Sequence, residues 1–152
     1  YDKNGEEAQI DFNTSINATE NEDYFIKIVE KDEQYFYGVV DKEGNELIKS
    51  SYGYIEYLYD DYFIAVDQSN KEGIIDVNNN IKLEFKYTLV QKIQNTNLIR
   101  TLNSSTTEIY SKDFKKIYTM KNANIETEGT TIKIYNETET KYFDTNGIEI
   151  NK

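Results

Sequence analysis

The sequence predicts an all-β fold built from tandem four-strand units of about 35 residues. Three observations predict it: a motif that recurs at a fixed offset, short apolar segments between polar separators, and alternation within those segments. The motif Gly38–Asp41 (GVVD) returns 35 residues later as Gly73–Asp76 (GIID), and Glu108–Ser111 and Lys141–Asp144 follow at offsets of 35 and 33. A fixed period of this size indicates stacked units that bury apolar surface against one another.

Residues 52–86 illustrate the strands expected in every unit. Ile81, Leu83 and Phe85 alternate with Lys82 and Glu84, which is the period of a strand, and no helical period competes. The separators are two or three polar residues, too short for helices and typical of antiparallel meanders. The expected strands of this unit cover residues 54–58, 62–66, 73–77 and 81–85.

The third segment of each unit differs, because its apolar residues are adjacent instead of alternating. The pairs occupy positions 39–40, 74–75, 109–110 and 142–143. Neighbouring residues of a strand point to opposite faces, so we expect an inner strand that is covered on both sides. Gly44 and Gly147 then predict a tight turn that needs a positive φ, with Asn78–Asn80 as a substitute and Asp113–Lys115 as the weakest match.

We interpret residues 1–152 as a single repeat domain. It contains a partial unit at 1–12, which resembles the last two strands of an earlier unit, and whole units at 14–50, 52–86, 88–121 and 123–152. Two arrangements are expected, a propeller-like one and an open β-repeat array. The partial unit has no complement at the other end, so the array is expected either to be cut from a longer one or not to close.

Composition restricts the classes of function. Hydrophobic residues make up 38% of the chain, but 14% are aromatic, which is too many for a disordered protein. The net charge is −11, from 28 acidic and 17 basic residues, and Arg100 is the only arginine. Nucleic acid is therefore a poor partner, since phosphate binding needs clustered Lys and Arg. A basic protein, a cation or a neutral glycan remains compatible with this charge.

The missing residue types exclude several chemistries. The chain has no cysteine and no histidine, which rules out zinc–thiolate sites, cysteine nucleophiles and histidine-based triads. No apolar run is long enough for a transmembrane segment. Because the chain begins at Tyr1 without a Met, we expect a trimmed or mature form that has lost a signal or lipoprotein anchor, and hence an extracytoplasmic protein, whether secreted, surface-bound or a lipoprotein.

The unit resembles the WG (KWG) repeat, a β-stranded repeat of bacterial proteins. The family pattern runs Trp-Gly, two apolar residues, Asp, a Gly turn, an Ile-Pro segment and Lys-Tyr-Asp. Residues 37–44 and 47–55 correspond to its two parts, and 72–76 and 86–89 repeat them. Lys49 stands where the family has Pro, and four other residues stand where it has Trp: Tyr37, Glu72, Thr107 and Thr140. The resemblance implies repeated β-hairpins and no catalytic residue.

The sequence contains three kinds of candidate site. Adjacent acids such as Glu6-Glu7 could form an acid–base pair, although 28 acids make chance adjacency common. Asp2–Glu6 and Asp76–Asn80 begin like calcium loops, but the same letters suit a β-turn and the distal Glu of an EF-hand is missing. The third candidate is a tyrosine- and aspartate-rich segment that could stack a sugar, hold a cationic group or simply pack across strands: Tyr52, Tyr54, Tyr57, Tyr59, Asp60 and Asp61.

We therefore predict a non-enzymatic β-repeat module that mediates protein–protein interaction as part of a larger bacterial surface or secreted protein. Its expected binding residues are the six of the Tyr52–Asp61 segment, with no catalytic residue, metal or cofactor. The alternatives are a cell-wall or glycan-binding module that uses exposed tyrosines, and a hydrolase that uses paired carboxylates.

Overall fold

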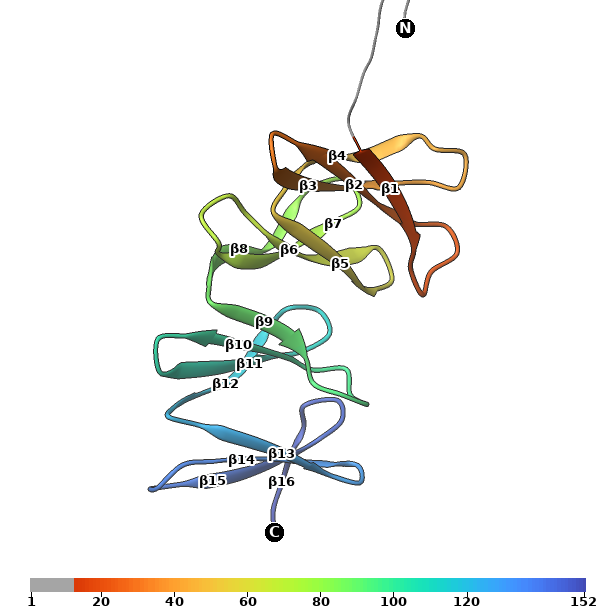
Figure 1. Cartoon of the computed structure of the whole chain (residues 1–152). Helices are drawn as coiled ribbons and strands as arrows, with labels where there is room; N and C mark the ends of the chain where they lie inside the picture. Colours follow the sequence, from red (N-terminus) through yellow and green to blue (C-terminus); the bar gives the residue numbers. More distant parts are fainter. Residues whose placement is uncertain (1–12) are drawn as a thin grey trace, which may run out of the picture. The chain divides into compact units, whose positions relative to one another are not determined.

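Sixteen β-strands and no helix make up residues 13–152, the part of the chain that the computed structural model describes (Figure 1). The predicted partial unit at 1–12 and the predicted loop Asp2–Glu6 lie outside these residues. The strands form four four-stranded sheets, each with its strands in chain order. The predicted all-β class with four-strand units is therefore confirmed. Within residues 13–152, no helix is long and apolar enough to cross a membrane.

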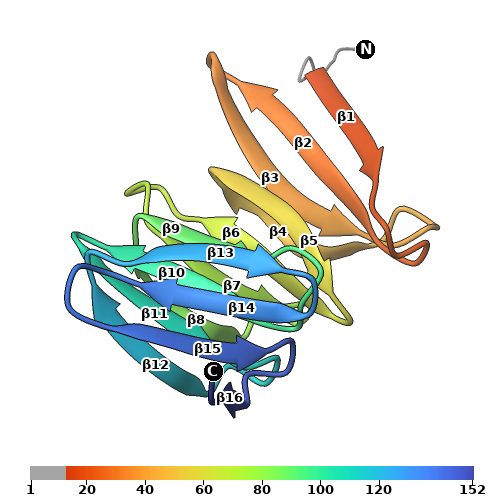
Figure 2. The same cartoon turned by 90° about the horizontal axis from the view of Figure 1, so that it is seen from below.

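The strands follow one another at short intervals. The first sheet contains β1 (Asn13–Ala18), β2 (Phe25–Lys31), β3 (Gln34–Val40) and β4 (Glu46–Tyr52). The second contains β5 (Tyr54–Tyr59), β6 (Tyr62–Val66), β7 (Glu72–Asp76) and β8 (Ile81–Tyr87). The third contains β9 (Leu89–Lys92), β10 (Ile99–Asn103), β11 (Thr106–Tyr110) and β12 (Lys116–Lys121). The fourth contains β13 (Asn124–Glu128), β14 (Thr131–Tyr135), β15 (Thr140–Asp144) and β16 (Glu149–Ile150). Figure 2 shows the order of the strands in this fourth sheet.

The chain divides into two compact units. Among the described residues, one comprises residues 13–70 together with Ile75–Ile81, and the other comprises Lys71–Ile74 together with Lys82–Lys152. In the second unit, the apolar faces of the third and fourth sheets share a core. Its buried members come from both sheets and from the loop after β9: Ile93, Leu98, Ile109, Met120, Ile132, Ile134 and Phe143.

The third strand of each of the first three sheets has the character predicted from its adjacent apolar residues. Val39 and Val40 on β3 are 0% and 3% exposed, and Ile74 and Ile75 on β7 are both 0% exposed. Ile109 and Tyr110 on β11 are buried in the same way. Since neighbours on a strand face opposite sides, each of these inner strands is covered on both faces, as predicted.

The fourth sheet departs from this pattern on one face. Phe143 is buried, but its neighbour Tyr142 is only half-buried. The Tyr142 ring lies under the Lys152 ammonium at 5.3 Å, and the Lys133 ammonium lies 4.6 Å from the Tyr135 ring. Tyr135 also donates its hydroxyl hydrogen bond to Glu126 at 2.5 Å. This face is therefore aromatic and charged, in contrast to the apolar faces of the inner strands.

The turn after each third strand uses one hydrogen-bond pattern. Asp41, Asp76, Ser111 and Asp144 each accept a backbone hydrogen bond from the residue three positions later and donate their own N–H to the carbonyl four positions later. Each side-chain oxygen also accepts from the backbone N–H four residues on, at 2.8–3.2 Å. Gly44, Asn79, Phe114 and Gly147 occupy the positive-φ position. The Asp76–Asn80 segment is thus a β-turn, and the Asp76 carboxylate accepts hydrogen bonds from Asn78 and Asn80 of the same turn.

Gly38 and Gly73 are required by close approach of the next strand. A Cβ at position 38 would lie 2.4 Å from the Ile48 carbonyl oxygen, and one at position 73 would lie 2.5 Å from the Leu83 carbonyl oxygen. The register between β3 and β4 shifts on both sides of Val39, which brings the β4 backbone close to Gly38. In the third sheet, β11 and β12 pair regularly at the equivalent position, so Glu108 fits there.

Candidate functional site

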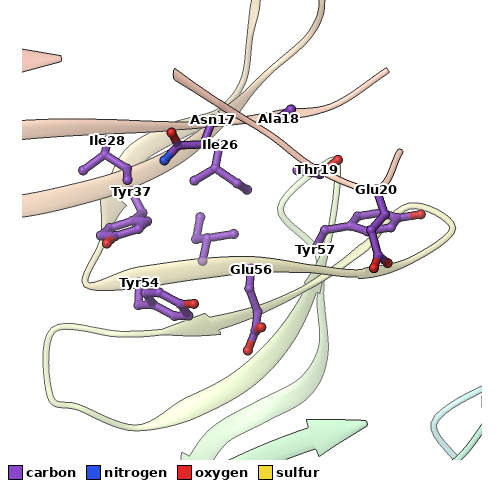
Figure 3. A pocket seen from close by; sticks show the side chains of 11 residues that line it. Asn17, Ala18, Thr19, Glu20, Ile26, Ile28, Tyr37, Tyr54, Glu56 and Tyr57 are labelled. Carbon is purple, nitrogen blue, oxygen red and sulfur yellow. The ribbon is translucent and has the colours of Figure 1, made fainter. Parts of the chain in front are cut away.

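An open pocket lies in the first unit, between the first sheet and strand β5 (Figure 3). We call it the tyrosine pocket, and its volume is about 510 Å³. It is bordered by the end of β1, the loop after it, the facing side of β2 and β3, and the first part of β5. Its lining residues are Asn17, Ala18, Thr19, Glu20, Ile26, Ile28, Tyr37, Tyr54, Ile55, Glu56 and Tyr57.

The register of the strands explains why the pocket has an apolar surface. Asn17 pairs with Ile26 across β1 and β2, Ile28 pairs with Tyr37 across β2 and β3, and directly paired residues share a face. Ile26 is buried, whereas Ile28 and Tyr37 are half-buried. This face of the sheet therefore presents aliphatic and aromatic surface to the pocket, and the acids Glu20 and Glu56 are both exposed.

Tyr37 and Tyr54 form an aromatic pair in the pocket. Their ring centroids lie 5.2 Å apart and the ring planes are inclined by 54°. Tyr54 is 42% exposed, one of the few large hydrophobic side chains that reach solvent in the described residues. Figure 3 shows the two rings toward one end of the pocket and Tyr57 toward the other. Both rings line the pocket, so a ligand there can contact both of them.

Tyr57 belongs to a second aromatic cluster that fixes its position. Its ring packs edge-on to Phe63 at 5.6 Å, and Tyr24 packs against both of these rings. The Tyr57 hydroxyl donates to the Asp60 carbonyl oxygen at 3.0 Å. Tyr24 donates to the Asp61 carboxylate at 2.5 Å, and burial together with this hydrogen bond raises the pKa of Tyr24 to about 12. Tyr57 is consequently a rigid wall of the pocket.

The structure separates the six residues of the Tyr52–Asp61 segment. Only Tyr54 and Tyr57 line the tyrosine pocket. Tyr52 ends β4 in the first sheet and donates to the Asn79 side chain at 2.6 Å, which ties it to a turn. Tyr59 packs against Tyr62 at 6.0 Å. Asp60 takes a positive φ of 48° in the β5–β6 turn, and Asp61 accepts the Tyr24 hydroxyl.

Sequence reasoning missed most of the pocket. Tyr37, Ile26 and Ile28 come from strands at least 17 residues before Tyr54, and nothing local links them to β5. One signal was available: Tyr37 stands where the WG pattern has its Trp, a position that carries a large aromatic side chain. Glu20 and Glu56 replace Asp60 and Asp61 as the acids beside the tyrosines.

A second polar cluster lies in the second unit, around Glu108. One carboxylate oxygen accepts from the hydroxyls of Tyr110 at 2.8 Å and Tyr87 at 3.0 Å, and the other lies 2.8 Å from the Lys116 ammonium. The two hydroxyl oxygens also lie 2.9 Å apart, so the two hydroxyl hydrogens are shared among these three contacts. Burial raises the pKa values of both tyrosines. The hydrogen bond with Tyr87 and the hydrogen bond with the Glu108 carboxylate raise the pKa of Tyr110 further. Every group has a partner within the cluster, which is the arrangement of a structural network.

Glu108 is expected to make stability depend on pH. Burial by itself raises the pKa of Glu108, but hydrogen bonds from Lys116, Tyr110 and Tyr87 outweigh it and leave the pKa below its usual value. A carboxyl with a lower pKa in the folded state stabilises above the unfolded pKa of about 4.3, and this stabilisation is lost as the pH falls through the folded pKa. We expect Glu108→Gln to lower the free energy of unfolding by about 1–2 kcal/mol at neutral pH. We also expect this free energy to fall less steeply than in the wild type as the pH becomes acidic.

Urea unfolding over a pH series measures both effects. Glu128→Gln is the matched control, because it removes an exposed acid from the same unit and should change the free energy of unfolding by no more than about 0.5 kcal/mol. A Glu108→Gln protein as stable as the wild type at neutral pH would show that the network does not stabilise the fold.

Neither the tyrosine pocket nor the polar cluster around Glu108 has the features of a metal centre. Among residues 13–152, no group of three or more Asp or Glu side chains is placed to hold a metal ion. Glu20 and Glu56, the acids of the tyrosine pocket, are both exposed.

Comparisons with known proteins give no family for this chain. No protein-family model matches it, and no curated protein matches its sequence. The resemblance to the WG repeat stays a prediction that depends on the repeat period and on residues 35–90.

Proposed function

We propose that this chain is a non-enzymatic interaction module that holds an extended segment of a partner protein in the tyrosine pocket. The observation that carries the proposal is the tyrosine pocket itself: about 510 Å³ of open space with an aliphatic and aromatic surface. This volume is within the range of natural ligand sites and accommodates a few side chains. Tyrosine is favoured in such sites because it offers a large rigid contact with a polar tip.

The position of strand β1 favours a partner segment in an extended conformation. It lies at the edge of the first sheet, and all six of its residues are exposed. Within residues 13–152, no strand pairs with its outer edge. The β1 residues carry no charge that would block pairing, and such an edge can accept an added strand through its backbone groups. Asn17 and Ala18 of β1 also border the pocket, so side chains of an added strand would be close to it.

The glycan-binding alternative has less support. A sugar-binding repeat would carry exposed tyrosines at equivalent positions, but the residues 35 and 70 positions after Tyr54 are Leu89 and Asn124. The setting in a larger bacterial surface or secreted protein is part of the proposal only through the WG resemblance.

Selection from a random peptide library on the wild-type chain tests the proposal. We expect enriched peptides whose affinity falls at least about ten-fold in Tyr54→Ala, because truncation of a hot-spot aromatic residue costs about 2 kcal/mol or more and ten-fold corresponds to about 1.4 kcal/mol. Tyr35→Ala is the matched control: Tyr35 is 57% exposed, belongs to the same unit and does not line the pocket. It should leave the affinity unchanged.

Three results would contradict the proposal. The library could give no binder, the binders could be insensitive to Tyr54→Ala, or Tyr54-dependent binding could be found only on an oligosaccharide array. The last of these would favour the glycan-binding alternative.

A further inference from the structure

We propose that the tyrosine pocket is specific for a lysine side chain of the partner segment, with the ammonium group in contact with Tyr37 and Tyr54 and its charge favoured by the acids that line the pocket. This inference rests on the proposed function, because it names the chemistry that the same pocket recognises. It differs from the expectation drawn from the sequence, in which the acids were Asp60 and Asp61.

The geometry of the aromatic pair fits a compact cation. A cation interacts with an aromatic face when it lies within about 6 Å of the ring centroid. The Tyr37 and Tyr54 centroids are 5.2 Å apart and both residues line the pocket, so one ammonium group in the pocket can lie within this distance of both rings. The rings are inclined by 54° instead of being parallel. A planar guanidinium can stack flat on only one of two rings inclined in this way, whereas a compact ammonium can interact with both.

The charges around the pocket favour the same ligand. Glu20 and Glu56 line it, both are exposed, and none of the eleven lining residues is basic. The whole chain carries a net charge of −11, which attracts a basic segment over a longer range. An acidic or phosphorylated segment would be repelled by the same groups.

The apolar lining fits the rest of the side chain. Ile26, Ile28 and Ile55 supply aliphatic surface next to the aromatic pair. A lysine side chain has a four-carbon stem that packs on apolar surface while its ammonium reaches a polar or charged environment. A pocket that combines aliphatic surface, tilted aromatic rings and carboxylates therefore matches both parts of a lysine.

A double-mutant cycle tests this inference with the peptides enriched on the wild-type chain. We expect these peptides to contain lysine, and replacing it by norleucine, which keeps the stem but removes the charge, to weaken binding roughly five-fold. The same replacement should have a clearly smaller effect on a Tyr54→Leu protein and on a protein with both Glu20→Gln and Glu56→Gln, since each variant removes part of the groups that interact with the ammonium. Added salt should weaken the lysine peptide more than the norleucine peptide.

The matched control carries Glu84→Gln and Glu128→Gln. It makes the same change in net charge at two exposed positions outside the pocket and should retain the full effect of norleucine. Peptides that depend on Tyr54 but lack a basic residue, or that bind equally well with norleucine or better with arginine, would overturn the lysine inference and leave the proposed function intact. If no enriched peptide depends on Tyr54, both the proposed function and the lysine inference fail.

Discussion

Ile75→Asp is expected to abolish the cooperative urea transition of the second sheet. Ile75 lies on the inner strand β7 and is 0% exposed, with an equally buried neighbour, Ile74, on the other face. A carboxyl at this position would have to be buried without a designed partner, or remain neutral at the expense of its normal pKa. The expected loss is at least about 4 kcal/mol, which is close to the total stability of many domains, about 5–15 kcal/mol.

Far-UV circular dichroism during urea unfolding measures this loss. Ile81→Asp is the matched control, because Ile81 lies on β8 of the same sheet but is 59% exposed. It should shift the free energy of unfolding by no more than about 0.5 kcal/mol. A normal transition midpoint for Ile75→Asp would mean that the inner strand is not covered on both faces.

Gly38→Ala is expected to cost about 3 kcal/mol, the upper part of the range for overpacked sites. The added methyl group would lie 2.4 Å from the Ile48 carbonyl oxygen and 2.7 Å from the Ser50 nitrogen. Both are backbone atoms of β4, so a change of side-chain rotamer cannot relieve the contact, and the two strands must separate. Hydrogen exchange should then show loss of protection in β3 and β4.

Gly53→Ala provides the comparison at a glycine of the same unit. A Cβ there would lie 3.5 Å from its nearest neighbours, an ordinary van der Waals contact. We expect a change within about 0.5 kcal/mol. Equal losses for the two alanine variants would show that the cost does not come from the approach of β4 to Gly38.

The strands and the character of the inner strands could be predicted because they depend on nearby residues. Alternation at Ile81, Leu83 and Phe85 sets one apolar face, and the adjacent pair Ile74 and Ile75 requires cover on both faces. The turns were also predictable, because Gly44 and Gly147 take the positive φ that the sequence indicated. The weakest match was informative as well: Phe114 takes the same conformation, with Ser111 in place of the usual Asp.

The candidate site could be predicted only in part. Tyr54 and Tyr57 were identified as binding residues and line the pocket, while Tyr52 and Asp61 are engaged in contacts with Asn79 and Tyr24. A cluster of tyrosines in sequence indicates aromatic surface, but it cannot separate packing from binding. That distinction depends on which residues of the first sheet face β5, and this follows from strand register and not from composition.

The sequence by itself determined that this protein is made of repeated short strands, and which side of each strand is apolar, because these properties are set by residues within a few positions of one another. Only the tertiary structure decided that Tyr37 meets Tyr54, that Glu20 borders the same pocket, and that β11 and β12 pair regularly at Glu108, where the first two repeats have glycine. These features depend on the register between strands and on which faces pack together. Residues far apart in the chain set both, and their packing energies are shared over many contacts.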